Sequence, residues 1–154
     1  NMRAFTAVSD RLFRQAERYA RPVSVLMIDS DSLKTVNDTL GHEAGNRLLK
    51  IAVECIQSQL RQADLVARYG GDEFVVVLPE TSCSGAAGVA ERIRKGVESS
   101  PLATREKKVV TTVSIGVACY PNHGADLDTV MEKADQAMYA SKANGKNRTS
   151  LFSA

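Results

Sequence analysis

The sequence predicts an α/β fold in which helices flank a central mixed sheet. Residues 23–29 form a nearly continuous apolar run, as expected for a central strand that is covered on both faces. Amphipathic helical patterns alternate along the chain with segments rich in Val, Ile and Thr. A Gly-Gly pair at residues 70–71 separates two apolar arms, which predicts a tight β-hairpin with glycines at positive φ.

Each remaining element follows from its local pattern. The chain should open with a helix over residues 1–19, which Pro22 ends. A short helix over residues 32–40 should follow the first strand, and residues 41–46 should form a turn. The other predicted elements are a helix over 47–60, hairpin arms over 65–69 and 74–78, a helix over 86–97, a long strand over 109–119, a helix over 127–142 with Gly145 just past its end, and a last strand over 149–152.

Composition narrows the function classes. The 154 residues are enough for one domain with a buried core. With 20 basic and 18 acidic residues the net charge is only +2, so we expect no nucleic-acid partner, and phosphate chemistry would need locally placed charge. No apolar run approaches the ~20 residues of a membrane span, and no signal peptide is visible. We therefore expect a cytoplasmic domain without direct membrane contact.

The cysteines and histidines predict neither a disulfide nor a metal centre. Cys55, Cys83 and Cys119 are odd in number and show no CxxC spacing, so free thiols in a reducing cytosol are expected. His42 and His123 are far apart in sequence and pair with no cysteine, so a zinc site is not expected.

Carboxylates gather at two places in the predicted sheet. Asp29 and Asp31 lie at the carboxyl end of the first strand, where open α/β sheets usually place ligands. Asp72 and Glu73 follow the Gly-Gly pair directly. An acidic pair beside a backbone that a ligand can approach suits a metal-bound phosphate. From the hairpin residues alone, an ordinary turn with a solvated acidic tip explains the pattern equally well.

Taken together and in order, the motifs of the chain resemble those of the GGDEF family of nucleotide cyclases. The likeness covers almost the whole chain, so residues 1–154 are expected to form a single catalytic domain. Residues 1–5 resemble the tail of the family's leading motif, which indicates a fragment of a longer protein with preceding sensory or dimerisation segments. The matching motifs are DSDSLK at 29–34 with ND at 37–38, GHEAGN at 41–46, RQAD at 61–64, GGDEF at 70–74, VSIGV at 113–117, AD at 134–135 and KANGKNR at 142–148.

The resemblance implies a fold and a reaction. The fold is like the polymerase palm and adenylyl cyclases, with a ferredoxin-like core and the hairpin at the active site. Two GTP molecules, one held by each of two facing domains, would become cyclic di-GMP and pyrophosphate. Because one domain holds half an active site, a homodimer is implied.

The resemblance also assigns the acidic residues. Asp29 and Asp72 match the family's metal-binding carboxylates, and the backbone carbonyl of Ser30 is a further expected ligand. The metal would be two Mg²⁺ ions, for which Mn²⁺ can substitute. Glu73 matches a residue that either activates the 3′-hydroxyl or holds the second metal, and the sequence leaves both roles open. We expect Asp31 to be structural.

Other matching positions concern the nucleotide. Gly70 and Gly71 would let the hairpin backbone approach it. Lys34, Lys142 and Lys146 match positions that contact the terminal phosphates, although Lys146 stands where the family usually has arginine. Solvated lysines near a helix end are the simpler interpretation. Asn37 matches a residue that hydrogen-bonds the guanine edge, and Leu33 replaces a usual phenylalanine by local repacking. The substrate-binding set is Leu33, Lys34, Asn37, Asn46, Gly70, Gly71, Lys142 and Lys146.

Asn46 departs from the family pattern, which usually has aspartate there. A carboxylate accepts from guanine N1–H and the exocyclic amine, whereas an amide presents one acceptor and one donor. Either purine can therefore pair with it, and a hybrid enzyme that joins GTP and ATP into cyclic GMP–AMP is the alternative to a strict cyclic di-GMP synthase. Asparagine is also a favoured helix N-cap, which is the plain structural interpretation of Asn46.

Two further hypotheses come from the resemblance. Arg61 and Asp64 form an RxxD five residues before GGDEF, in the register of the family's inhibitory product site, and Arg92 matches its second arginine. A surface ion pair is the simpler interpretation of RxxD. A catalytically silent module that senses GTP or cyclic di-GMP is the alternative to an enzyme, although such modules commonly lose the acidic loop that this chain keeps.

Overall fold

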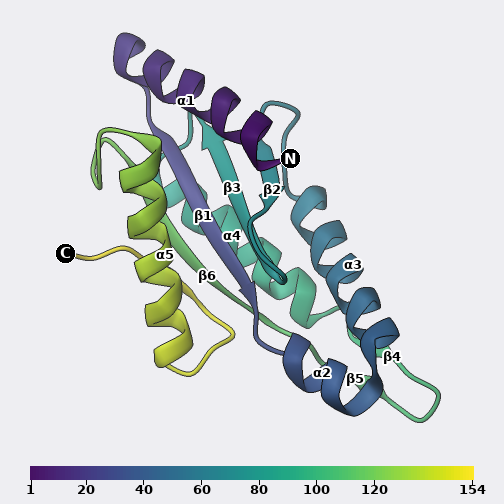
Figure 1. Ribbon diagram of the computed structural model, residues 1–154. Helices are drawn as coiled ribbons and strands as arrows, with labels where there is room; N and C mark the ends of the chain where they lie inside the picture. The colour runs from purple at the N-terminus through teal and green to yellow at the C-terminus, as the bar shows by residue number, and fades with distance from the viewer.

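A mixed sheet lies at the centre of the computed structural model, which describes residues 1–154 (Figure 1). The strand order is β2-β3-β1-β6-β7, antiparallel throughout except for the parallel pair β6 and β7. The predicted α/β class with a mixed sheet is therefore confirmed. The strands are β1 (Val23–Ser30), β2 (Leu65–Arg68), β3 (Glu73–Pro79), β6 (Val113–Tyr120) and β7 (Thr149–Leu151).

Helices cover both faces of this sheet (Figure 1). α1 and α5 pack on one face with Val25 and Met27 of β1, whereas α3 and α4 pack on the other with Leu26 and Ile28. The alternation along β1 follows from the two-residue period of a strand, and both faces are buried because helices lie on each. The helices are α1 (Met2–Tyr19), α2 (Leu33–Leu40), α3 (His42–Ser58), α4 (Cys83–Glu98) and α5 (Leu127–Ala143). None of these helices is both long enough and apolar enough to span a membrane.

Gly116 determines how closely α5 approaches the sheet. A Cβ atom added there would lie 2.0 Å from the carbonyl oxygen of Ala134 and 2.2 Å from the amide nitrogen of Met138. The helix backbone therefore rests directly on β6, and the Ser141 hydroxyl donates to the carbonyl of Ile115 at 2.9 Å. This contact fixes the carboxyl end of α5 beside the end of β1.

The structure corrects several predicted boundaries. Residues 42–46 are the first turns of α3 rather than a turn, because Gly41 is the N-cap and the helix continues from there. Residues 109–119 are not one strand: Lys108–Val109 (β5) pairs with Leu102–Ala103 (β4) in a separate two-stranded sheet, and β6 begins only at Val113. Propensity indicated extended backbone there but gave no sign that the pairing partner changes.

The hairpin exists, but its turn is not the predicted tight one. Arg68 pairs with Phe74, so five residues form the connection, and neither Gly70 nor Gly71 has a positive φ. The Tyr69 amide donates to the carbonyl of Glu73 at 2.7 Å. The two glycines therefore do not serve a two-residue turn.

The cysteine prediction is wrong in this structure. Cys83 and Cys119 form a disulfide, and only Cys55 is free. His123 also lies beside a cysteine, since its Nδ1 is 3.6 Å from the sulfur of Cys119. The paired cysteines are 36 positions apart, and no sequence pattern indicated that they would meet.

Candidate active site

The sheet brings the predicted acidic residues to one edge. Asp29 is the register partner of Glu73 across β1 and β3, and the amide of Ser30 donates to the carbonyl of Asp72 at 3.2 Å. The carboxyl end of β1 and the acidic end of the hairpin are thus joined by backbone pairing. The side chains that the sequence places 43 and 44 positions apart meet because the two strands are antiparallel neighbours.

Asp29 is an incompletely satisfied carboxylate. Its side chain is 17% exposed, and its Oδ1 atom is buried without a hydrogen-bond partner. Burial raises the pKa of Asp29 to about 6; Lys142 opposes this shift, and the charge of Asp72 adds to it. A buried acceptor without a donor costs free energy, so this oxygen is suited to a bound cation.

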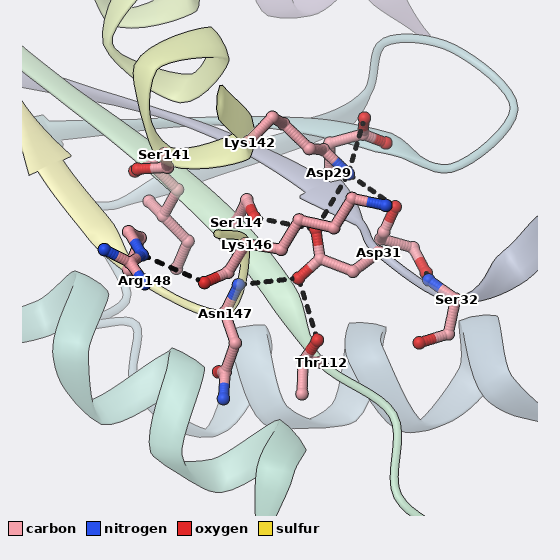
Figure 2. Close-up of polar contacts among 12 residues, drawn as sticks. Asp29, Asp31, Ser32, Thr112, Ser114, Ser141, Lys142, Lys146, Asn147 and Arg148 are labelled. Carbon is pink, nitrogen blue, oxygen red and sulfur yellow. Dashed lines mark hydrogen bonds and ion pairs between the residues drawn. The ribbon is translucent and has the colours of Figure 1, made fainter. Parts of the chain in front are cut away.

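Lys142 reaches the same place from the end of α5 (Figure 2). Its ammonium donates to the carbonyl of Ser30 at 2.8 Å and to Asp31 Oδ1 at 2.9 Å, and it lies 3.2 Å from Asp29 Oδ2. Burial alone would lower the pKa of Lys142, but the hydrogen bond to Asp31 and the two carboxylate charges raise it above its usual value. The Asp29 carboxylate and the Ser30 carbonyl, which were predicted as metal ligands, therefore both contact the ammonium group of Lys142.

Asp31 is the most fully bonded residue of the site (Figure 2). It accepts from Thr112 Oγ1 at 2.8 Å, Ser114 Oγ at 2.7 Å and the Asn147 amide at 3.0 Å, besides Lys142. Although burial raises the pKa of Asp31, hydrogen bonds from Lys142, Ser114 and Thr112 outweigh it and leave the pKa below its usual value. Four donors of the protein thus surround the carboxylate of Asp31.

Two residues predicted to bind the substrate, Leu33 and Asn37, lie against Gly45 where α2 packs on α3. A Cβ atom on Gly45 would lie 1.9 Å from Asn37 Oδ1 and 3.2 Å from a methyl carbon of Leu33. Gly45 therefore lets the amide of Asn37 lie against α3. Asn46 is the next residue and is exposed. Because it lies inside α3, the interpretation of Asn46 as an N-cap is wrong.

The two glycines of the hairpin differ in their surroundings. A Cβ atom on Gly70 would lie 3.2 Å from Glu73 Oε2, so glycine leaves room for that carboxylate, whereas Gly71 has nothing within 4 Å. Arg68 secures the loop by donating through Nε to the carbonyl of Gly71 at 3.0 Å and through Nη2 to the same oxygen. This role of Arg68 was not predicted from the sequence. The only available signal was an arginine just before the turn residues Gly70 and Gly71, whose carbonyls it contacts.

The three predicted lysines differ in their placement. Lys142 is held by the aspartates, whereas Lys34 near the start of α2 and Lys146 after α5 are exposed. Lys146 and Asn147 both have positive φ, and this conformation turns the backbone N–H of Asn147 toward the carboxylate of Asp31. The reasoning from sequence missed Thr112, Ser114 and Asn147, because their roles depend on a buried partner in another element.

The RxxD residues and Arg92 line one pocket at the other end of β2. Arg61 pairs with Asp64 at 2.9 Å and donates to the carbonyl of Pro79 at 2.8 Å and to Thr81 Oγ1 at 2.9 Å. Arg92 of α4 donates to Gln59 Oε1 at 3.0 Å. Arg61 and Arg92 face the same cavity of about 200 Å³, which is lined by Gln59, Arg61, Asp64, Leu78, Thr81, Val89 and Arg92.

Comparison with known proteins places this arrangement in a family. The family model described as "Diguanylate cyclase, GGDEF domain" matches residues 1–148. The chain belongs to the GGDEF domain family. Within this family, the chain is 44% identical to diguanylate cyclase A of Treponema denticola over 149 aligned residues. The aligned region covers 96% of this chain and 40% of that protein. The chain thus spans less than half the length of this curated relative.

Solved structures of GGDEF domains match the fold along nearly the whole chain. The GGDEF domain of PA1120 (YfiN or TpbB) from Pseudomonas aeruginosa is 37% identical with a TM-score of 0.91, covering 97% of this chain and 94% of that one. The GGDEF domain of DgcB from Caulobacter crescentus, in complex with c-di-GMP, is 34% identical with a TM-score of 0.89, covering 97% and 88%. The predicted family is therefore confirmed.

Proposed function

We propose that this GGDEF domain condenses two GTP molecules into cyclic di-GMP with release of pyrophosphate. The observation that carries the proposal is the buried, unpartnered Oδ1 of Asp29 beside the carbonyl of Ser30 and the acidic end of the hairpin. A purely structural acid at this position would be expected to have a hydrogen-bond donor on each oxygen, whereas only Oδ2 of Asp29 has a partner, the ammonium of Lys142. A site for a hard cation at Oδ1 explains why that oxygen has no donor.

The donor set fits the metal that the family implies. Asp29, the Ser30 carbonyl, Asp72 and Glu73 offer only oxygen atoms, which Mg²⁺ and Mn²⁺ prefer. Bound there, two such ions would neutralise phosphate charge and lower the pKa of the 3′-hydroxyl. Glu73 is either a ligand or the group that accepts the hydroxyl proton, and its carboxylate at the start of β3 is compatible with both roles.

The protein residues orient the nucleotide around this edge. We assign the terminal phosphates to Lys34, Lys142 and Lys146, and the guanine to the junction of Leu33, Asn37 and Asn46. Because each domain holds one nucleotide, two copies must face each other for the bond to form, and the active species is a homodimer.

One assay tests the activity. The chain is incubated with Mg²⁺ and GTP over a range of protein concentrations, and dinucleotides are identified by mass spectrometry. We expect cyclic di-GMP, with an initial rate that rises faster than linearly with protein concentration. Asp72→Ala should abolish turnover. If GTP binds but no dinucleotide forms at any protein concentration, the domain is a sensing module and the catalytic proposal fails.

Asn46 favours a second candidate, a mixed cyclase that also accepts ATP and makes cyclic GMP–AMP. The amide is exposed on α3 directly after Gly45, so nothing in the protein fixes which of its ends faces the base. Asn46→Asp should restore a charged acceptor and increase the preference for GTP over ATP by roughly 10- to 100-fold. Cyclic di-GMP as the only product of the unsubstituted chain, even with ATP in excess, would eliminate the mixed cyclase.

We further assign product inhibition to the cavity that Arg61, Asp64 and Arg92 share. Two guanidinium groups in one small pocket suit the phosphates and the planar bases of a cyclic dinucleotide. The c-di-GMP complex of DgcB supports ligand binding of this class in a related domain. The buried carboxylate of Asp64 would then hold Arg61 in position for the ligand.

A further inference from the structure

Three residues outside the cyclase site gather at the opposite end of β6. Cys83 is the first residue of α4, and Cys119 lies near the end of β6, where β1 begins rather than where it ends. Their Cα atoms are 5.6 Å apart, which is within the usual range for disulfides. His123, from the connection between β6 and α5, places its Nδ1 3.6 Å from the sulfur of Cys119.

The two sulfurs have unequal access to solvent. Cys119 is 1% exposed, and the ring of His123 covers it while packing edge-on against Phe152 with centroids 5.2 Å apart. Cys83 is only partly buried. It also lies at the amino-terminal end of a 16-residue helix, where the backbone dipole stabilises a thiolate. Solvent access therefore directs an external thiol to Cys83 and not to Cys119, whereas the dipole favours the Cys83 thiolate as the attacking group in the reverse reaction.

A metal centre fits these residues less well. The sulfurs and the imidazole provide three candidate ligands within 4.8 Å of one another, whereas structural zinc sites close with four. The Nδ1 of His123 already accepts the amide of Cys119 at 3.0 Å, so the ring nitrogen that faces the sulfurs is occupied. The geometry favours two sulfurs that bond to each other.

We propose that Cys83 and Cys119 form a thiol–disulfide exchange site, whose redox state sets how firmly the amino-terminal end of α4 is held on β6. A low-molecular-weight thiolate attacks Cys83, the bond between the protein sulfurs breaks, and its electron pair leaves with Cys119, which takes up a proton. A second thiol then releases Cys83 from the mixed disulfide. The protein gains two hydrogens, and two small thiols become one disulfide.

The disulfide attaches the start of α4 next to a residue, Thr81, that is already hydrogen-bonded to the sheet side of the molecule. Thr81 donates its amide to the carbonyl of Pro22 at 3.3 Å, and its own carbonyl accepts from Ser24 at 2.7 Å. The oxidised pair extends this attachment by two residues into the first turn of α4. Opening it should therefore loosen that turn without displacing the central strands.

The test compares the chain in buffers of reduced and oxidised glutathione. Alkylation after unfolding in denaturant, followed by mass spectrometry, should count one free cysteine in the oxidised chain and three in the reduced chain. The oxidised form should melt higher by roughly 10 °C, because the disulfide closes a long loop, and hydrogen exchange should slow at residues 83–87. Cys55→Ser is the matched control: it should leave the melting difference unchanged.

Single variants test the asymmetry and the alternatives. With Cys119→Ser, oxidised glutathione should form a mixed disulfide at Cys83 at least about tenfold faster than at Cys119 in Cys83→Ser. Equal rates would overturn the assignment of Cys83 as the attacked sulfur. Three alkylated cysteines in both buffers, or one zinc ion per chain that is lost in Cys83→Ser, would overturn the exchange site itself.

Discussion

Replacing Lys142 with methionine should tighten the binding of a divalent cation in the absence of nucleotide. The ammonium contacts the Ser30 carbonyl at 2.8 Å and lies 3.2 Å from Asp29, so it holds two of the groups assigned to the metal. A cation that enters must displace it or share its ligands. Methionine keeps the length of the side chain and removes the competing charge.

The distances give a magnitude. At an effective dielectric constant of about 20, unit charges 3.2 Å apart attract by ~5 kcal/mol, and desolvation of the two side chains offsets much of this. We work with the ~1.5–3 kcal/mol of a charge-assisted hydrogen bond. Since 1.4 kcal/mol corresponds to a factor of ten, the dissociation constant for Mn²⁺ should fall by about tenfold or more.

Titration of free Mn²⁺ by electron paramagnetic resonance measures this constant directly. Lys146→Met is the matched control, because that exposed lysine has no contact with Asp29 and its loss should leave Mn²⁺ affinity unchanged. Circular dichroism should verify the fold, since Asp31 loses one of four partners. With GTP the sign should reverse: Lys142→Met should raise KM, because a phosphate contact is lost. Mn²⁺ affinity equal to or weaker than that of the unsubstituted chain would refute the competition.

Three further predictions concern stability and regulation. Asp29 binds protons more tightly when folded, with a pKa of about 6 against 3.8, so the free energy of unfolding without metal should fall by about 2 kcal/mol between pH 4 and pH 7; urea titrations should show this slope in the unsubstituted chain but not in Asp29→Asn. Gly116→Ala should cost about 3 kcal/mol or more in the same assay, whereas Gly96→Ala, whose Cβ atom would meet only Cys55 Sγ at 3.7 Å, should stabilise α4 by about 0.5–1 kcal/mol. Arg61→Ala should leave the initial rate of turnover unchanged and relieve inhibition by accumulated product; unchanged inhibition would eliminate the product site.

The sequence predicted those parts of the fold whose signal is local. The run at 23–29 identified β1 because both of its faces are buried, and helical periodicity located the four long helices, although α3 begins five residues earlier than predicted. The prediction from sequence failed where the structure of a segment depends on which strand it pairs with. Residues 109–119 have strand propensity throughout, but the pairing partner changes from β4 to β1 between Val109 and Val113. No pattern within that segment records the change.

The candidate site divides in the same way. Residue types and motif spacing identified the acidic residues, and antiparallel pairing of β1 with β3 explains why they meet. The contact of Lys142 with Asp29 and Asp31 depends on how α5 sits on β6, which Gly116 determines through an atom that it lacks. A close backbone approach of this kind leaves only a glycine in the sequence, and glycine has many other uses.

Asp29, in β1, and Asp31, directly after it, show how two neighbouring carboxylates at the end of one strand can differ. Asp31 receives four hydrogen bonds, its side chain is 4% exposed, and its pKa is lowered, so it stays ionised and anchors Lys142. Asp29 shares that ammonium but leaves one buried oxygen without a donor, and burial raises its pKa. The difference lies in the donors around each residue rather than in the residue type. Because Asp31 meets the need of Lys142 for a counter-ion, Asp29 can release the ammonium to a phosphate and accept a metal without leaving a buried charge unpaired.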